Sequence, residues 1–86
     1  MIKLGYKPSF LRQYNKLESA LQEETREKIE LFKNRKNHKQ LKVHRLKGKL
    51  EDKWSFSVNY SYRIVFKWED KNTAVLLAVD DHDVYL

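Results

Sequence analysis

The sequence predicts an α+β fold in the order β-α-α-β-β-β, with a helical hairpin packed on a small, mostly antiparallel sheet. Residues 54–58 and 62–68 alternate between large apolar and mostly polar side chains, which is typical of two half-buried strands. Residues 73–79 are almost entirely apolar, as in a central strand buried on both faces. Residues 8–35 instead repeat apolar side chains every three or four positions, the period of amphipathic helices.

The elements before residue 35 follow from spacing and from helix-end signals. Residues 2–6 alternate weakly and predict an edge strand, and Pro8 suits the first turn of a helix. A second helix is expected to begin at a capping box made by Ser19 and Gln22. The apolar stripes that face the core are then Phe10, Tyr14 and Leu17 in the first helix, and Leu21, Thr25, Ile29 and Phe32 in the second.

The elements after residue 35 are predicted to build most of the sheet. Residues 34–40 are polar and predict a connection, and Gly48 marks a turn in the weakly alternating residues 41–50. Residues 69–72 predict a four-residue hairpin loop before the central strand. In the two alternating strands, one face is predicted to meet the helices through Trp54, Phe56, Tyr62, Ile64 and Phe66. The other, a polar front, would carry Ser55, Ser57 and Arg63.

Composition narrows the class of protein. The 86 residues predict a single domain over residues 1–86. The chain has no cysteine, no signal-peptide pattern and no apolar run long enough to span a bilayer, so we expect a soluble, cytoplasmic protein. The net charge is +6, and half of the 18 Lys and Arg residues fall within residues 33–53. This asymmetry favours a polyanion or an acidic protein partner, and a solvated lysine-rich surface is the alternative.

The residues that can carry chemistry are few. The three histidines lack the spacing of a metal site and no glycine-rich phosphate loop is present, so neither a metal nor another cofactor is expected. Arg63 lies in an aromatic strand, where it either forms a structural ion pair or binds phosphate. His82 lies between two aspartates that favour imidazolium, a proton donor, and Tyr85 either packs under the sheet or stacks on a base. Together they suit metal-free RNA cleavage.

Four segments carry a family resemblance. Residues 7–17 (KPSFLRQYNKL) are similar to a first helix, and residues 44–48 (HRLKG) fit an H-x-L-x-G pattern. Residues 54–58 and 62–66 (WSFSV and YRIVF) resemble a W-S-x-R-V…Y-R-I-x-F sheet signature, and residues 82–85 (HDVY) a shortened H-D-x-x-Y. Through them the chain resembles the RelE/ParE superfamily of bacterial toxins of type II toxin–antitoxin systems, in its RelE-type branch, which includes the YafQ- and HigB-like members.

The resemblance implies a toxin that cuts mRNA in the ribosomal A site and is neutralised by a cognate acidic antitoxin. Arg63 would bind the phosphate, His82 would be the general acid and Tyr85 would stack on or orient the substrate. His44 would be a general base or a substrate contact. The RNA-binding cations would be Lys42, Arg45, Lys47, Lys49 and Lys53, a set we call the basic belt. An acidic partner segment is expected to lie over this belt.

Ser55, Ser57 and Ser61 depart from the pattern, because relatives keep catalytic side chains at these positions. Two alternatives therefore stand beside the nuclease. One is a ParE-like toxin that poisons DNA gyrase without cutting RNA, which the fold alone does not distinguish. The other is a weakly active or inactive member that mainly binds its antitoxin.

Overall fold

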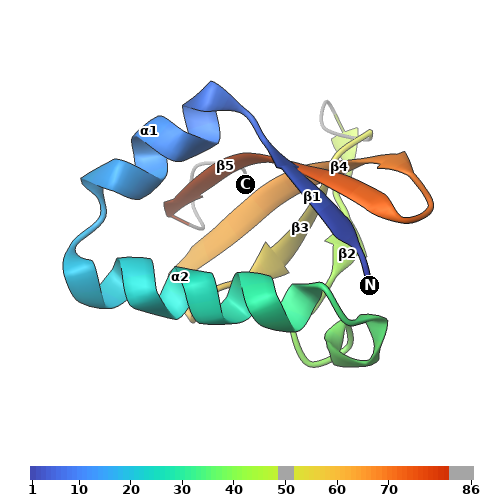
Figure 1. Cartoon of the computed structure of the whole chain (residues 1–86), viewed down its shortest axis with the longest axis horizontal. Coiled ribbons are helices and arrows are strands. Elements are labelled where there is room, and N and C mark those ends of the chain that lie inside the picture. The colour runs from blue at the N-terminus through green and yellow to red at the C-terminus, as the bar shows by residue number, and fades with distance from the viewer. Residues whose placement is uncertain (49–51, 82–86) are drawn as a thin grey trace.

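The computed structural model describes residues 1–48 and 52–81 (Figure 1). Two helices pack on a five-stranded, mostly antiparallel sheet, so the predicted fold class is confirmed. The predicted element order is also confirmed, with one short strand added at residues 44–45. The elements are β1 (Lys3–Tyr6), α1 (Pro8–Lys16), α2 (Ser19–Phe32), the 3₁₀ turn η1 (Arg35–Asn37), β2 (His44–Arg45), β3 (Trp54–Ser57), β4 (Tyr62–Asp70) and β5 (Thr73–Asp81).

The sheet has the strand order β1-β5-β4-β3-β2. Strand β1 pairs with β5 in parallel, and every other neighbouring pair is antiparallel. The prediction that residues 2–6 form an edge strand is therefore confirmed. Residues 73–79, predicted as a central strand, form a strand with a neighbour on each side, β1 and β4, while β4 is the middle strand of the five. Strand β4 lies in the middle of the sheet, with hydrogen-bonded neighbours on both sides. The backbone that carries its side chains is therefore firmly held.

Helix α1 covers part of the edge of β5. Strand β1 pairs with β5 only as far as Leu76, and the chain then turns into the helix. Beyond that point the Ser9 hydroxyl donates to the Leu77 carbonyl (2.8 Å), and the Gln13 side-chain oxygen accepts from the Val79 amide (3.0 Å). These side chains satisfy backbone groups that an open sheet edge would expose. The first helix thus binds the sheet partly through its edge.

The main core lies between the sheet and the helices. Phe32 at the end of α2 is fully buried, and its ring stacks on Phe56 from β3 (centroids 4.3 Å apart) and meets Phe66 of β4 edge-on (4.9 Å). The predicted apolar face of the strand pair is confirmed, with Phe56, Ile64 and Phe66 fully buried and Trp54 and Tyr62 packed at its margin. The apolar stripes of both helices also face this core, through Phe10 from α1 and Thr25, Ile29 and Phe32 from α2.

Two local predictions are wrong. The capping box does not form, because Ser19 is already the first residue of α2. Glu18 is the N-cap and makes no side-chain cap, and the Gln22 side chain donates instead to the Tyr14 carbonyl (3.0 Å). The hairpin loop has two residues instead of four, since β4 continues to Asp70. The Asp70 carboxylate accepts from the Asn72 amide (2.8 Å), which closes a tight turn and lowers the pKa of Asp70.

Asn59 holds the turn between β3 and β4, and its replacement by alanine is expected to destabilise the fold by about 2 kcal/mol. Its side-chain oxygen accepts from the amides of Ser61 (2.8 Å) and Tyr62 (2.9 Å), and its amide group donates to Glu24 on α2 (2.7 Å). Urea unfolding followed by tryptophan fluorescence measures the loss. Asn15→Ala, the same change at an exposed position of α1, should stay within about 0.5 kcal/mol of wild type. Equal effects at the two sites would contradict the assignment.

Candidate functional site

The candidate site lies on the sheet face opposite the core aromatics, here called the front face. Side chains of paired residues on neighbouring strands point to the same face, and alternate residues point away. The pairing places Ser57, Arg63 and Asp80 in one row across β3, β4 and β5. The next row holds His44, Ser55, Val65 and Ala78, from β2 to β5. The front face therefore brings the predicted Arg63 and His44 to one surface.

The front face is more apolar than predicted. Leu46, Val65 and Ala78 form a second buried cluster on it, with Leu77 packed alongside. Leu46 continues from β2, and its amide donates to the Lys53 carbonyl (2.8 Å). Ser55 on the same face is only 1% exposed, although its polarity predicted a position on an open polar surface. Period-two alternation identifies which residues share a face, but whether that face is covered depends on other segments.

Arg63 is built into the middle of the sheet. It is 4% exposed, and its guanidinium atoms Nε and Nη2 are buried. The backbone of Arg63 is fixed because strands pair with it on both sides. Its guanidinium is a planar fork of donors, a geometry that matches the oxygens of phosphate or carboxylate. Burial also lowers the local dielectric, which strengthens its attraction for an anion. The position suits recognition of a single phosphate group that comes into contact with the front face.

His44 is exposed on β2, at the edge of the front face. Its Nδ1 lies 2.8 Å from the Lys42 carbonyl oxygen. Because a carbonyl only accepts, Nδ1 carries the hydrogen and Nε2 of the neutral ring is left as an acceptor. Strand spacing puts the Cα atoms of His44 and Arg63 about 12 Å apart, two strands across and one row along. A histidine with a free Nε2 can take a proton from a hydroxyl.

The members of the basic belt that the structure describes lie near His44 in the chain. Lys42, Arg45 and Lys47 are exposed, and a hollow of about 400 Å³ is lined by residues 45–48. Lys42 has a left-handed backbone (φ 58°), a conformation that costs a non-glycine residue of order 1–3 kcal/mol and is frequent at functional sites. Lys53 is half-buried and donates to Asp52 (3.2 Å), which lowers the pKa of that carboxyl. The exposed cations give this edge a positive surface.

Three of the predicted site residues lie outside the described residues: His82, Tyr85 and Lys49. Asp80 is the site residue that sequence reasoning missed. It is the cross-strand neighbour of Arg63 on β5, and its carboxylate accepts from the Asp81 amide (2.7 Å). The length of the hairpin turn between β4 and β5 decides which residue lies opposite Arg63, and that length was predicted wrongly. A four-residue loop would place Ala78 opposite Arg63, whereas the two-residue turn at residues 71–72 places Asp80 there.

Within residues 1–48 and 52–81, no group of three or more His, Asp or Glu side chains is placed to hold a metal ion. Over the same residues, no helix is long and apolar enough to cross a membrane.

Comparison with known proteins agrees with this architecture. The solution structure of a conserved hypothetical protein from Helicobacter pylori is 23% identical, with a TM-score of 0.68 over 95% of this chain and 96% of that one. In the RelBE toxin–antitoxin complex of Escherichia coli the similar chain is 19% identical, with a TM-score of 0.72 and coverage of 96% and 99%. In the YoeB–YefM complex of Staphylococcus aureus the similar chain is 16% identical, with a TM-score of 0.72 over 95% of this chain and 98% of that one. Comparison with curated proteins by sequence gives no match.

At these sequence identities, the solved structures show the fold alone, and it is the fold of the RelE-like proteins. The family follows from sequence. Residues 9–82 match the model of the HigB-like toxins, described as the RelE-like toxin of the type II toxin–antitoxin system HigB. The chain belongs to this family of toxins, and the resemblance seen in its sequence is confirmed.

Proposed function

We propose that this toxin is a ribosome-dependent endoribonuclease that cleaves mRNA without a metal ion and so inhibits translation in the cytoplasm. The observation that carries the proposal is the strand register. It places a buried arginine, Arg63, on the same sheet face as His44, whose Nε2 is free to accept a proton. Membership of the HigB-like toxins supports the assignment.

The proposed reaction is an internal transfer at one phosphodiester. His44 Nε2 takes the proton of the ribose 2′-OH, and the 2′-oxygen bonds to the adjacent phosphorus. The bond from phosphorus to the 5′-oxygen breaks, and His82 supplies the proton that the leaving oxygen needs. Arg63 binds the phosphate oxygens as negative charge accumulates on them. The products are a 2′,3′-cyclic phosphate and a 5′-hydroxyl, so no water, metal or redox partner is consumed.

The basic belt is proposed to hold the RNA backbone beside this centre, with Lys49 as a further contact and Tyr85 stacking on a base. Lys42, Arg45 and Lys47 are exposed along the edge that leads to His44. Cations that neutralise phosphates give affinity that falls as salt rises and carries little sequence preference. The ribosome would then position the mRNA for cleavage.

An acidic antitoxin is the proposed protein partner. Solved structures with this fold include complexes with antitoxins, among them the RelBE and YoeB–YefM pairs. An antitoxin segment rich in Asp and Glu would compete with RNA for the same exposed cations of the belt, which would inhibit the toxin directly. Reversing the charge of Lys47 would then weaken both the antitoxin and the RNA complex.

The test is cleavage of mRNA on purified, programmed ribosomes, with the cut positions and end groups mapped. The expected result is cutting within the A-site codon that leaves cyclic phosphate ends. Added EDTA should not slow the cutting, provided that enough Mg²⁺ is supplied to keep the ribosomes intact. A supercoiling assay with purified gyrase runs in parallel. Inhibited gyrase with intact mRNA would support the ParE-like alternative, and an effect on neither target would support the antitoxin-binding alternative. Either result would overturn the proposal.

His44→Ala is expected to slow cleavage by about 10²–10³-fold, the usual contribution of a general base. Single-turnover cleavage rates make the measurement, with RNA binding recorded alongside, and the rate should fall while RNA affinity stays close to that of wild type. A variant whose loss lies entirely in weaker RNA binding would show that His44 is a substrate contact and not the base.

A further inference from the structure

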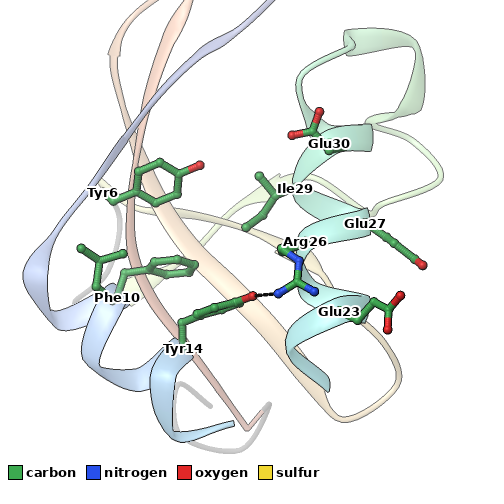
Figure 2. Close-up of a pocket in the computed structure, with 9 residues that line it drawn as sticks. Tyr6, Phe10, Tyr14, Glu23, Arg26, Glu27, Ile29 and Glu30 are labelled. Atoms are coloured by element: carbon green, nitrogen blue, oxygen red, sulfur yellow. Dashed lines mark hydrogen bonds between the residues drawn. The ribbon is translucent and has the colours of Figure 1, made fainter. Parts of the chain in front are cut away.

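A groove of about 580 Å³ lies between α1 and α2 (Figure 2). Phe10 and Ile29 belong to its apolar lining and are almost fully buried. Tyr6, Phe10 and Tyr14 form a continuous aromatic row along one wall, with successive ring centroids 5.7 and 6.2 Å apart. Apolar surface lies open to solvent at the rim, since Tyr6 is 44% and Leu11 47% exposed. Exposed apolar surface that is continuous with a groove is characteristic of a docking site.

The other wall of the groove is acidic. Glu23, Glu27 and Glu30 occupy positions i, i+4 and i+7 of α2 and belong to the lining of the groove. Figure 2 shows all three on α2, across from the aromatic row. Glu30 accepts from Lys33 (2.7 Å), and this bond raises the pKa of Lys33. Neither Glu23 nor Glu27 forms an ion pair within the part of the chain that the structure describes. Like charges four residues apart on a helix repel each other, and a bound cation would relieve this repulsion.

One end of the groove is closed by a polar bridge. The Arg26 guanidinium donates to the Tyr14 hydroxyl across the groove, as the dashed line in Figure 2 shows. Gln22 adds a second link between the helices through the Tyr14 carbonyl (3.0 Å). Among the described residues, Arg26 is the one cation that lines the groove, and its bond to Tyr14 already engages it. The remaining wall therefore presents two unpaired carboxylates beside an aromatic surface, on a protein whose net charge is +6.

We propose that this groove is the docking site of a basic amphipathic helix from a partner protein. The apolar side of that helix would cover Tyr6, Phe10 and Leu11, and its Lys or Arg side chains would pair with Glu23 and Glu27. Helices that bind in grooves use apolar anchors at i, i+3, i+4 and i+7. The acidic wall spans about 10 Å from Glu23 to Glu30, so a partner of three turns would reach along it. The same acidic wall repels RNA, and the site is independent of the proposed nuclease chemistry.

Fluorescence anisotropy with a labelled peptide of about 14 residues, or four helical turns, tests the proposal. The probe carries leucine at i, i+3, i+4 and i+7 with flanking lysines, and a second probe carries glutamate in place of lysine. The wild-type protein is expected to bind the basic probe at least tenfold more tightly than the acidic one. Glu27→Lys should weaken the basic complex by about tenfold, and Leu11→Ser should also weaken it. Salt should reduce the affinity for the basic probe.

Glu69→Lys is the matched control, because Glu69 is an exposed glutamate at the far hairpin and the charge change is the same. It should leave binding within about twofold of wild type. Equal losses from Glu27→Lys and Glu69→Lys, or equal affinity for the two probes, would overturn the proposal. Sedimentation analysis identifies the other possible occupant. A wild-type dimer that Glu27→Lys dissociates, without peptide binding, would assign the groove to a second copy of this chain and also overturn the proposal.

Discussion

Arg63→Ala is expected to lower the rate of mRNA cleavage by about 10²–10³-fold, the usual cost of removing one donor that stabilises transition-state charge. Arg63 lies in the central strand, is 4% exposed and has Ser57 and Asp80 as its cross-strand neighbours. Its guanidinium atoms Nε and Nη2 are buried in the sheet, which restricts their movement, so we expect little reorganisation when the phosphate binds. The measurement is the single-turnover rate on programmed ribosomes, which should fall much more than RNA affinity.

Arg63→Lys separates charge from geometry. Lysine keeps the positive charge but loses the planar fork, so we expect a smaller but clear loss of rate. Arg12→Ala is the matched control, since Arg12 is exposed and lies on α1, outside the strands that build the front face. Circular dichroism and urea unfolding establish that each variant is folded. A folded Arg63→Ala protein that cleaves mRNA at the wild-type rate would remove the central element of the proposed mechanism.

Phe32→Ala is expected to destabilise the protein by about 3–5 kcal/mol, the range measured for truncating a buried phenylalanine. Phe32 has no exposed surface and joins α2 to the sheet, with the Phe56 ring stacked at 4.3 Å and the Phe66 ring at 4.9 Å. Domains have a total stability of roughly 5–15 kcal/mol, so the loss would leave a marginal fold. Urea unfolding followed by tryptophan fluorescence is a direct probe, because Trp68 lies 6.0 Å from the Phe32 ring.

Two further variants interpret that result. Phe32→Leu retains most of the side-chain volume and should cost clearly less than the alanine change. Tyr60→Ala removes a ring that is 99% exposed and should change stability by less than about 0.5 kcal/mol. A loss below about 1 kcal/mol for Phe32→Ala would mean that the helix is held to the sheet mainly by other contacts, such as those of Ile29.

The sequence did not predict which residues of β4 and β5 lie opposite each other. An arginine in an aromatic strand is unusual, which marks Arg63 in the sequence as a candidate, and the structure places it on the predicted face. Its neighbour Asp80 was not found, because an error of two residues in a hairpin loop changes which residues lie opposite each other. The wrong capping box has a similar origin. Ser19 and Gln22 have the right spacing, but the preceding turn already places Glu18 at the N-cap.

Periodicity along the chain was enough to predict the fold class, the two helices, the core face of the strand pair and the interior strand at residues 73–79. These features depend on neighbours within a few residues, where spacing and side-chain type reflect burial directly. Pairing between distant segments was not readable in the same way. The tertiary structure alone shows β1 parallel to β5, α1 along a sheet edge, and a second apolar cluster at Leu46, Val65 and Ala78. It also creates the groove at Glu23 and Glu27, because two helices predicted separately enclose a space only when both are fixed to one sheet.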